Sequence, residues 1–463
     1  MLLGYQVAYT KKQIALISIA IIILGLAEFI VATSFSFSYR AIIILVGLPL
    51  VLGILIDHRL AVLAFFVTLF VPFDISIFTL PVLMPPILFL SFMLWHESIE
   101  SAVEFNALFK PFLISYLLML PSLVNAHNIP FSLFRSYNYL SIGLLLITLP
   151  AFFSTFESVK KALDIFVIVN VINVFHVIFE TFYYNYRSFG FPGIVYVDFA
   201  SLSLVISILF LLKYGEKKYL IYAALLLLGM VFTQTRNVLL SLFFAFSVYL
   251  FLLTRYDFGI DKKKVFSRIT VVIVGFTGII LLFIILKPEV FSRLIGLVEL
   301  GQGTLLYEAD FGKNSFLTRV LLWYTAVKAF LANPIFGMGI YSFPFDSKSY
   351  SELTPFLFNS YVQGLSTHIT YLSILTEAGV VGFIGFCYFL VKTFNFGLGT
   401  LKVALVEQKE HAYLVLTVLV LYSYILFSMF LSDAWLIGQC AMIWASVMVL
   451  MVSLDNQFKS KRI

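Results

Sequence analysis

Charged residues and cysteine are both scarce in this sequence of 463 residues. Only 12% of the residues are Asp, Glu, Lys or Arg, whereas 61% are hydrophobic, and a soluble domain carries about 25% charged residues. No polar stretch is long enough to fold by itself as a soluble enzyme domain. The two cysteines, Cys387 and Cys440, lie inside apolar runs without CxxC spacing, so we interpret them as core residues.

Metal-binding patterns are missing as well. The segments that we place outside the membrane contain no DxD-like motif and no His/Asp cluster, so neither a metal nor another cofactor is predicted. The net charge of +6 would suit a nucleic-acid partner, but Lys and Arg in cytoplasmic loops are the better explanation in a membrane protein. No nucleic-acid partner is therefore predicted.

Long apolar runs dominate what is present. A helix needs about 17–25 apolar residues to cross the hydrocarbon core, and a pass with that window predicts fourteen spans. These lie near 13–33, 41–56, 60–73, 75–94, 109–124, 139–153, 165–182, 199–213, 219–233, 238–254, 269–287, 369–391, 412–431 and 434–453. We therefore predict an all-α polytopic membrane protein with about 12–14 transmembrane helices.

The distribution of Lys and Arg orients these spans. With the N-terminus inside, most of the 30 Lys and Arg residues fall in inner segments, as the positive-inside rule requires. Both termini are then cytoplasmic. Residues 1–287 hold the first eleven spans, residues 288–367 form one large outer loop, and residues 368–463 hold the last three spans.

Every cation in a short outer loop is an arginine: Arg40, Arg135, Arg187 and Arg236. Arginine binds phosphate through a rigid bidentate fork, although interfacial snorkelling explains such residues equally well for Arg40 and Arg135. Arg236 lies in Thr-Gln-Thr-Arg-Asn, a polar island between two apolar runs. Such an island is costly at the membrane edge unless it faces a cavity or is paired, which favours a functional role for Arg236.

The large loop carries one strongly periodic stretch, residues 315–331, which predicts an amphipathic helix along the outer membrane surface. Arg319 and Trp323 are four residues apart and share a face. Two interpretations stay open, a lid packed on the bundle and a lid that delivers Arg319 to a site. Asn333-Pro334 ends the helix, and Gly337-Met338-Gly339 predicts a tight turn.

A span begins directly after this loop with His368 at its outer mouth. A lone histidine there is usually structural, yet neutral imidazole can act as a general base near pH 7. Glu377 lies nine residues on, on the opposite face of an ideal helix, so we do not pair it with His368 and expect it to bond a neighbouring helix. Gly379, Gly382 and Gly385 would permit close helix packing.

These residues resemble the O-antigen ligase and O-antigen polymerase superfamily over roughly residues 230–390. The shared pattern is Thr-Gln-Thr-Arg236, then Arg319-x-x-x-Trp323 and Asn-Pro-Ile-Phe-Gly-Met-Gly, then a helix led by His368. That helix continues as His-Ile-Thr-Tyr-Leu to Glu-Ala-Gly-Val-Val-Gly. Ile369 departs from the family's usual Asn, so a hydrogen bond from that Asn is not expected here.

The resemblance implies a membrane enzyme with a fold similar to lipid-dependent glycosyltransferases of the GT-C-like type. Members transfer glycans from undecaprenyl diphosphate at the outer face of the bacterial cytoplasmic membrane. By resemblance, Arg236 and Arg319 would clamp the diphosphate, with Arg187 as a weaker candidate, and His368 would be catalytic, taking or orienting the acceptor proton. The reaction would be metal-independent and inverting.

Several alternatives remain at this stage. The acceptor is another glycan in a polymerase and lipid A–core, in lipopolysaccharide assembly, in a ligase; the number of predicted spans favours the polymerase. A chain-length regulator is a possible further partner beside membrane lipids. A transporter of lipid-linked glycan is a third reading, but the sequence shows no internal repeat and no charged residues gathered at mid-bilayer.

Overall fold

The computed structural model describes about two thirds of the chain in separate stretches. These are residues 65, 69, 74–75, 78–95, 107–184, 196–233, 237–259, 261, 263–270, 278, 315–433 and 438–460. Regular structure in these stretches is helical, apart from a short antiparallel pairing of β1 (Asp74–Ile75) with β2 (Phe78–Thr79).

The helices follow one another with short connections. In the first half they are α4 (Leu80–Trp95), α6 (Phe109–Met119), η1 (Leu120–Asn125), α7 (Ile129–Thr148), η2 (Leu149–Phe152), α8 (Phe156–Tyr184), α9 (Tyr196–Tyr214), α10 (Lys217–Thr233) and α11 (Asn237–Arg255). In the second half they are α14 (Ser315–Ala332), α15 (Phe343–Asp346), η7 (Ser347–Tyr350), α16 (Pro355–Tyr361), α17 (Thr370–Glu407), α18 (Ala412–Ser428) and α19 (Gly438–Ser460).

An all-α polytopic membrane protein is confirmed. Among the described residues, five helices are long and apolar enough to cross a membrane, namely Phe156–Thr181, Tyr196–Tyr214, Val238–Arg255, Thr370–Glu407 and Gly438–Lys459. Two shorter apolar helices join them, Phe109–Asn125 and Ala412–Ser428. The predicted spans 13–33 and 41–56, and nearly all of 60–73 and 269–287, lie outside the described residues.

Two predicted boundaries are wrong. The span expected from residue 75 begins at Leu80, because residues 74–79 reverse direction in the β1–β2 pair. Pro81 then falls in the first turn of α4, where a missing N–H breaks no intrahelical bond. The span expected over 369–391 extends to Glu407; its 38 residues measure about 57 Å at 1.5 Å per residue, well beyond a hydrocarbon core of about 30 Å.

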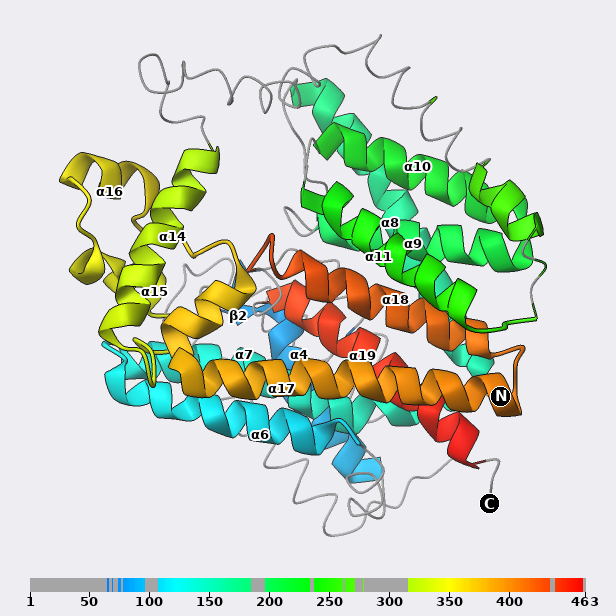
Figure 1. Ribbon diagram of the computed structural model, residues 1–463, viewed down its shortest axis with the longest axis horizontal. Helices are drawn as coiled ribbons and strands as arrows, with labels where there is room; N and C mark the ends of the chain where they lie inside the picture. The colour runs from blue at the N-terminus through cyan, green and yellow to red at the C-terminus, as the bar shows by residue number, and fades with distance from the viewer. Residues whose placement is uncertain are drawn as a thin grey trace, which may run out of the picture.

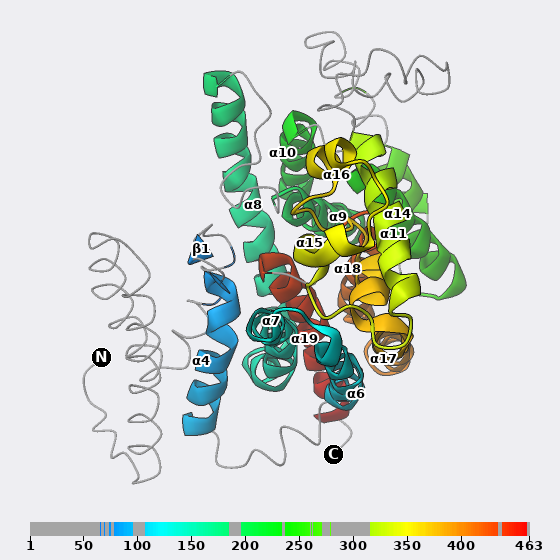
Figure 2. The same ribbon diagram turned by 90° about the vertical axis from the view of Figure 1, so that its left-hand side faces the viewer.

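The helices pack as a bundle whose two ends differ. Figure 1 shows α17 running the length of the bundle, with α14, α15 and α16 gathered where α17 begins. We call this the loop end. Figure 2 looks onto it and shows α14, α15 and α16 in front of the bundle. At the opposite end Gln457 Nε2 donates to the Phe153 carbonyl at 2.8 Å, which ties α19 to the segment before α8.

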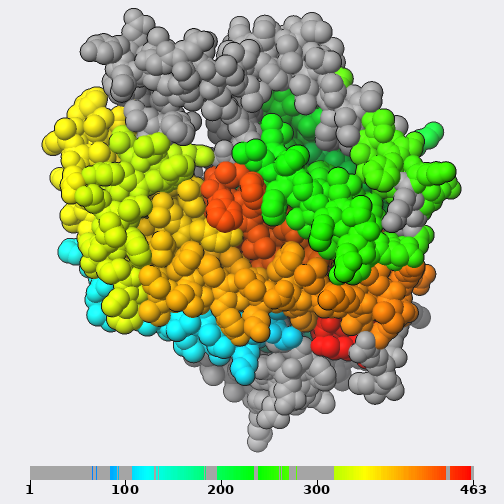
Figure 3. All heavy atoms as spheres, viewed as in Figure 1, coloured from blue at the N-terminus to red at the C-terminus, as the bar shows by residue number. Residues whose placement is uncertain are grey.

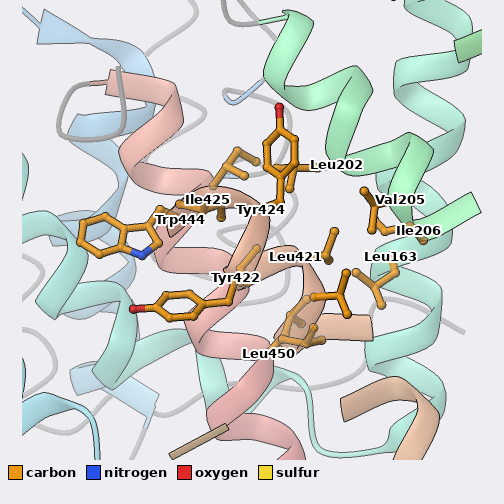
Figure 4. Close-up of a cluster of buried hydrophobic side chains, with 14 of the residues drawn as sticks. Leu163, Leu202, Val205, Ile206, Leu421, Tyr422, Tyr424, Ile425, Trp444 and Leu450 are labelled. Carbon is orange, nitrogen blue, oxygen red and sulfur yellow. The ribbon is translucent and has the colours of Figure 1, made fainter. Parts of the chain in front are cut away.

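The core lies where α9, α18 and α19 meet. About nine tenths of the apolar window of α9 and of α19 is buried within the protein, and a helix that is hydrophobic on every side belongs in an interior. Figure 4 shows Leu163, Leu202, Leu421 and Leu450 converging between these helices and α8. Trp444 is fully buried. The outward side chains of α8 and α11 are apolar too, which suits contact with lipid.

Helix α17 is broken at Gly379, whose φ of 63° and ψ of −169° are non-helical. The turn after α14 fills the break. Met338 and Gly339 donate their N–H groups to the carbonyls of Thr376 and Glu377, at 3.1 and 2.9 Å. The N–H groups of Val380 and Val381 donate to the carbonyls of Pro334 and Ile335, at 2.9 and 3.2 Å. These bonds satisfy backbone groups that a break would otherwise leave unpaired.

Glycine is required on both sides of this junction. A Cβ on Gly337 would lie 2.4 Å from the Glu377 backbone, and a Cβ on Gly379 would lie 2.3 Å from the Ile335 carbonyl oxygen. For Gly379 the prediction of helix packing is therefore wrong, because it joins a helix to a turn. For Gly385 it is confirmed, since a Cβ there would be 3.0 Å from Leu118 Cβ and 3.3 Å from Ser115 Cα on α6.

We predict that Gly379→Ala lowers stability by at least about 2 kcal/mol, because alanine resists positive φ and its Cβ meets the Ile335 carbonyl. The matched control is Gly399→Ala in the same helix, where an added Cβ meets nothing within 4 Å. Its effect should be neutral or slightly stabilising. Apparent melting temperatures of the two purified variants in one detergent test this; equal melting temperatures would contradict it.

Candidate functional site

Helix α14 crosses the bundle at the loop end and is fixed by its inner face. Leu322 and Ala326 are fully buried in a cluster with Met338 and Phe343. Trp323 Nε1 donates to the Thr367 carbonyl at 3.1 Å, immediately before His368. Arg319 lies one turn before Trp323, so this bond brings the arginine toward the histidine. Figure 3 shows α14 covering this end, with the end of α18 (orange-red) at the surface between α14 and α11.

His368 sits in a strained backbone conformation, with φ at +57°. A non-glycine residue in this region costs about 1–2 kcal/mol, and such strain persists only where neighbouring contacts enforce it. One of these contacts comes from Asp433, whose Oδ2 accepts the His368 backbone N–H at 3.3 Å. The carboxylate Oδ1 also lies 3.8 Å from His368 Nδ1. Asp433 thus faces both the backbone and the ring of His368.

The start of α17 is tied to the link that carries Asp433. The Thr370 N–H donates to the carbonyls of Met429 and Ser432, at 2.9 and 3.2 Å. Thr370 Oγ1 donates to the Ser432 carbonyl at 2.6 Å. Ile369 occupies the N-cap of α17 without a side-chain cap; the Thr367 hydroxyl accepts its N–H at 3.3 Å instead. These bonds hold histidine and aspartate in one arrangement.

The charges around His368 act in opposite directions. Burial lowers the pKa of His368 below its ordinary value of 6.5, Asp433 raises the pKa, and Arg319 lowers it. Burial also lowers the pKa of Arg319, and Asp433 raises it; the guanidinium nonetheless stays charged at neutral pH. Because the net shift at His368 is downward, its imidazole is neutral near pH 7 and can accept a proton.

Glu377 is used differently from the prediction. It was expected to bond a neighbouring helix, but Oε2 accepts the Tyr341 N–H at 2.8 Å and Oε1 accepts the Phe343 N–H at 3.4 Å. The prediction is wrong because the break at Gly379 brings this loop, and not a helix, against the carboxylate. Tyr341 in turn lies under Arg135, whose Cζ is 4.0 Å from the ring centroid.

The predicted site residues divide into two groups. Arg319 and His368 come together at the loop end, within electrostatic reach of each other. Arg187 and Arg236, like Arg40, lie outside the described residues. Arg135, for which snorkelling was as good an explanation, turns inward and lines a pocket that Asp433 also lines.

Sequence reasoning missed Asp433. It lies in the short link between the last two predicted spans, on the predicted outer side. A lone acid in so short an outer link was the available signal, but its partner is 65 residues away in sequence. Among the described residues, no three His, Cys, Asp or Glu side chains gather as metal ligands.

The fold and the site define a polytopic membrane protein with a histidine–carboxylate pair and a half-buried arginine at one end of its bundle. Residues 221–387, a little over a third of the chain, match the family model described as O-antigen ligase. The match includes Arg236, Arg319 and His368 and supports the O-antigen ligase and polymerase superfamily. It also supports glycan transfer of that type at a bacterial inner membrane. No curated protein matches the chain.

We predict opposite pKa shifts of His368 in two variants. Asp433→Asn removes the group that raises the pKa and should lower it further, whereas Arg319→Gln removes a group that lowers the pKa and should raise it. NMR titration of the six histidines, labelled with ¹³C at Cε1, measures this, with His368→Gln to assign the signal. A higher pKa in Asp433→Asn would show that the carboxylate does not face the ring.

Proposed function

We propose that the chain transfers an oligosaccharide or polysaccharide from undecaprenyl diphosphate to an acceptor hydroxyl at the outer face of the cytoplasmic membrane. The observation that carries this proposal is the arrangement of His368 between Asp433 and Arg319, within the segment that matches the O-antigen ligase family. The loop end would then face outward and both termini would be cytoplasmic.

The chemistry requires a base on one side of the anomeric carbon and positive charge on the other. His368, neutral at pH 7, takes the proton of the acceptor hydroxyl on Nε2, the ring nitrogen that does not face Asp433. Asp433 stabilises the imidazolium that forms, as a carboxylate partner does in other general-base sites. The acceptor oxygen bonds to the anomeric carbon while the bond from that carbon to the diphosphate oxygen breaks.

The leaving diphosphate carries the negative charge away. Arg319 stabilises this charge together with Arg236, and Arg187 is a further candidate for the same role. A guanidinium held in a partly desolvated place stabilises developing charge more strongly than one in water, and Arg319 is such a residue. Because arginines supply the positive charge, we propose a metal-independent reaction. A single displacement inverts the anomeric centre.

A polymerase and a ligase use the same chemistry and differ in acceptor. We favour the polymerase, which adds glycan to a lipid-linked repeat unit, because the fourteen predicted spans exceed what we expect of a ligase. The ligase would instead use lipid A–core. Transport is the remaining alternative. A neutral base beside a carboxylate and an arginine suits group transfer, whereas a transporter has no need of a strained histidine at one end of its bundle.

Deletion of the gene followed by complementation tests the function. We expect His368→Ala and Arg319→Ala each to lower transfer by about 10²-fold or more, and Arg236→Ala to do the same. The matched control is Lys328→Ala, which removes a cation from α14 that is exposed and paired with Glu352. Membrane levels are equalised by immunoblot, and surface glycan is resolved by gel.

The deletion strain distinguishes the alternatives. A single repeat on its acceptor identifies a polymerase, and long chains retained on the lipid carrier identify a ligase. If all three site variants restored long chains like the wild type, the proposed site would be wrong and transport would be favoured.

We further expect transfer by the purified protein to continue in EDTA, because arginines supply the positive charge. The new linkage should have the anomeric configuration opposite to that of the donor. NMR of the product decides the configuration, and residual rate in chelator decides the metal requirement. Retention of configuration, or loss of activity that Mg²⁺ restores, would contradict this mechanism.

A further inference from the structure

A second polar pocket lies beside His368. It is enclosed by the ends of α6 and α17 nearest the loop, the first turns of α7 and the stretch around Tyr341, and encloses about 670 Å³ including its open mouth. Sites for small molecules span about 300–1,000 Å³. Asp433 lines the pocket and also contacts His368. The pocket therefore opens onto the proposed base from the side of its carboxylate.

The charges in this pocket are balanced internally. Arg135 covers the Tyr341 ring, and Glu377 is engaged by two backbone N–H groups of the same loop. Burial raises the pKa of Tyr341, Arg135 lowers it, and Glu377 and Asp433 raise it, so all three charges reach this point. One cation between two carboxylates leaves no surplus positive charge to attract a phosphate or an acidic sugar. The pocket suits a neutral occupant.

Asn138 gives the pocket its clearest demand for a ligand. Its side chain lines the pocket and the residue is only 3% exposed. No described residue forms a hydrogen bond with its side-chain amide. A buried amide without a partner costs free energy, so one at a pocket wall suggests a bound group that supplies both an acceptor and a donor.

Three aromatic rings surround the same space: Tyr116, Tyr139 and Tyr341. Tyr139 lies one turn from Arg135 on α7, so the two share a face, and its hydroxyl is already bonded to Ser115 Oγ at 3.1 Å. These tyrosines therefore offer mainly ring surface. A carbohydrate matches this combination, because its C–H groups pack on rings while adjacent hydroxyls bond an amide in both directions.

We propose that this pocket is the acceptor subsite and binds a neutral pyranose at the end of the acceptor glycan, with Asn138 as a specificity-determining residue. This inference rests on the proposed function. A sugar held by Asn138 presents its free hydroxyl toward Asp433 and His368, while Arg319 remains on the donor side. Acceptor recognition is thereby separated from diphosphate binding.

Binding of simple sugars to the full chain in lipid nanodiscs tests the proposal. Saturation-transfer difference NMR would compare methyl glycosides of glucose, galactose, mannose and N-acetylglucosamine with methyl glucuronoside as the acidic probe. We expect at least one neutral glycoside to bind wild type more strongly than the glucuronoside. Asn138→Ala should weaken that binding about tenfold or more, the loss typical of one or two buried hydrogen bonds.

The matched control is Ser141→Ala, one turn further along α7. Ser141 is equally buried, but its Oγ donates to the Tyr137 carbonyl of its own helix at 3.0 Å, and it does not line the pocket. Ser141→Ala should bind like the wild type. Should Asn138→Ala fail to fold, Asn138→Asp keeps the size of the side chain and removes its donors, and it should weaken binding as well.

Transfer assays separate this inference from the proposed function. In them Asn138→Ala should raise the KM for acceptor with little change in the KM for donor. Arg319→Ala should abolish transfer and still bind the glycoside. If Arg319→Ala transferred glycan like wild type, the proposed function would fail. If no neutral glycoside bound wild type, or if Asn138→Ala bound it equally well, the subsite would be overturned.

Discussion

The backbone junction between the broken helix α17 and the turn after α14 is the constraint on which the rest of the site depends. Each side satisfies the other: the carbonyls before Gly379 accept N–H groups from Met338 and Gly339, and the N–H groups after it reach Pro334 and Ile335. Without the turn, the break would leave unpaired groups within a membrane helix, where each costs several kcal/mol. Without the break, the turn would have no seat on the bundle.

Two consequences follow from this junction. Glu377 is carried on the last turn before the break, and it holds the loop at Tyr341 and Phe343, which places the Tyr341 ring under Arg135. The junction also fixes the end of α14, and the Trp323 bond to the Thr367 carbonyl fixes its middle. The two walls of the site, one with Arg135 and one with Arg319, are thus set by the same small set of backbone contacts.

The site combines strain with opposed charges. His368 has a left-handed backbone, which the Asp433 carboxylate and the Thr370 bonds to the α18–α19 link enforce. The arrangement is pre-organised, because the base, its carboxylate and the arginine are held before any substrate arrives. A reaction that separates a proton from a diphosphate needs such fixed opposite charges in a partly dry place. The family match over residues 221–387 points to the same chemistry independently of this geometry.

The sequence by itself determined the membrane class, the positions of most described helices and the approach of Arg319 and Trp323 on one face of α14. These depend on hydropathy and on the helical period, which are properties of neighbouring residues. Only the tertiary structure decided that Asp433 faces His368, that Glu377 holds a loop, and that Arg135 turns into a pocket with Asn138. Those contacts join residues that are far apart in the chain, and the break at Gly379 brings many of them together. An ideal helix drawn through that glycine separates Glu377 from His368 correctly but cannot show what either one touches.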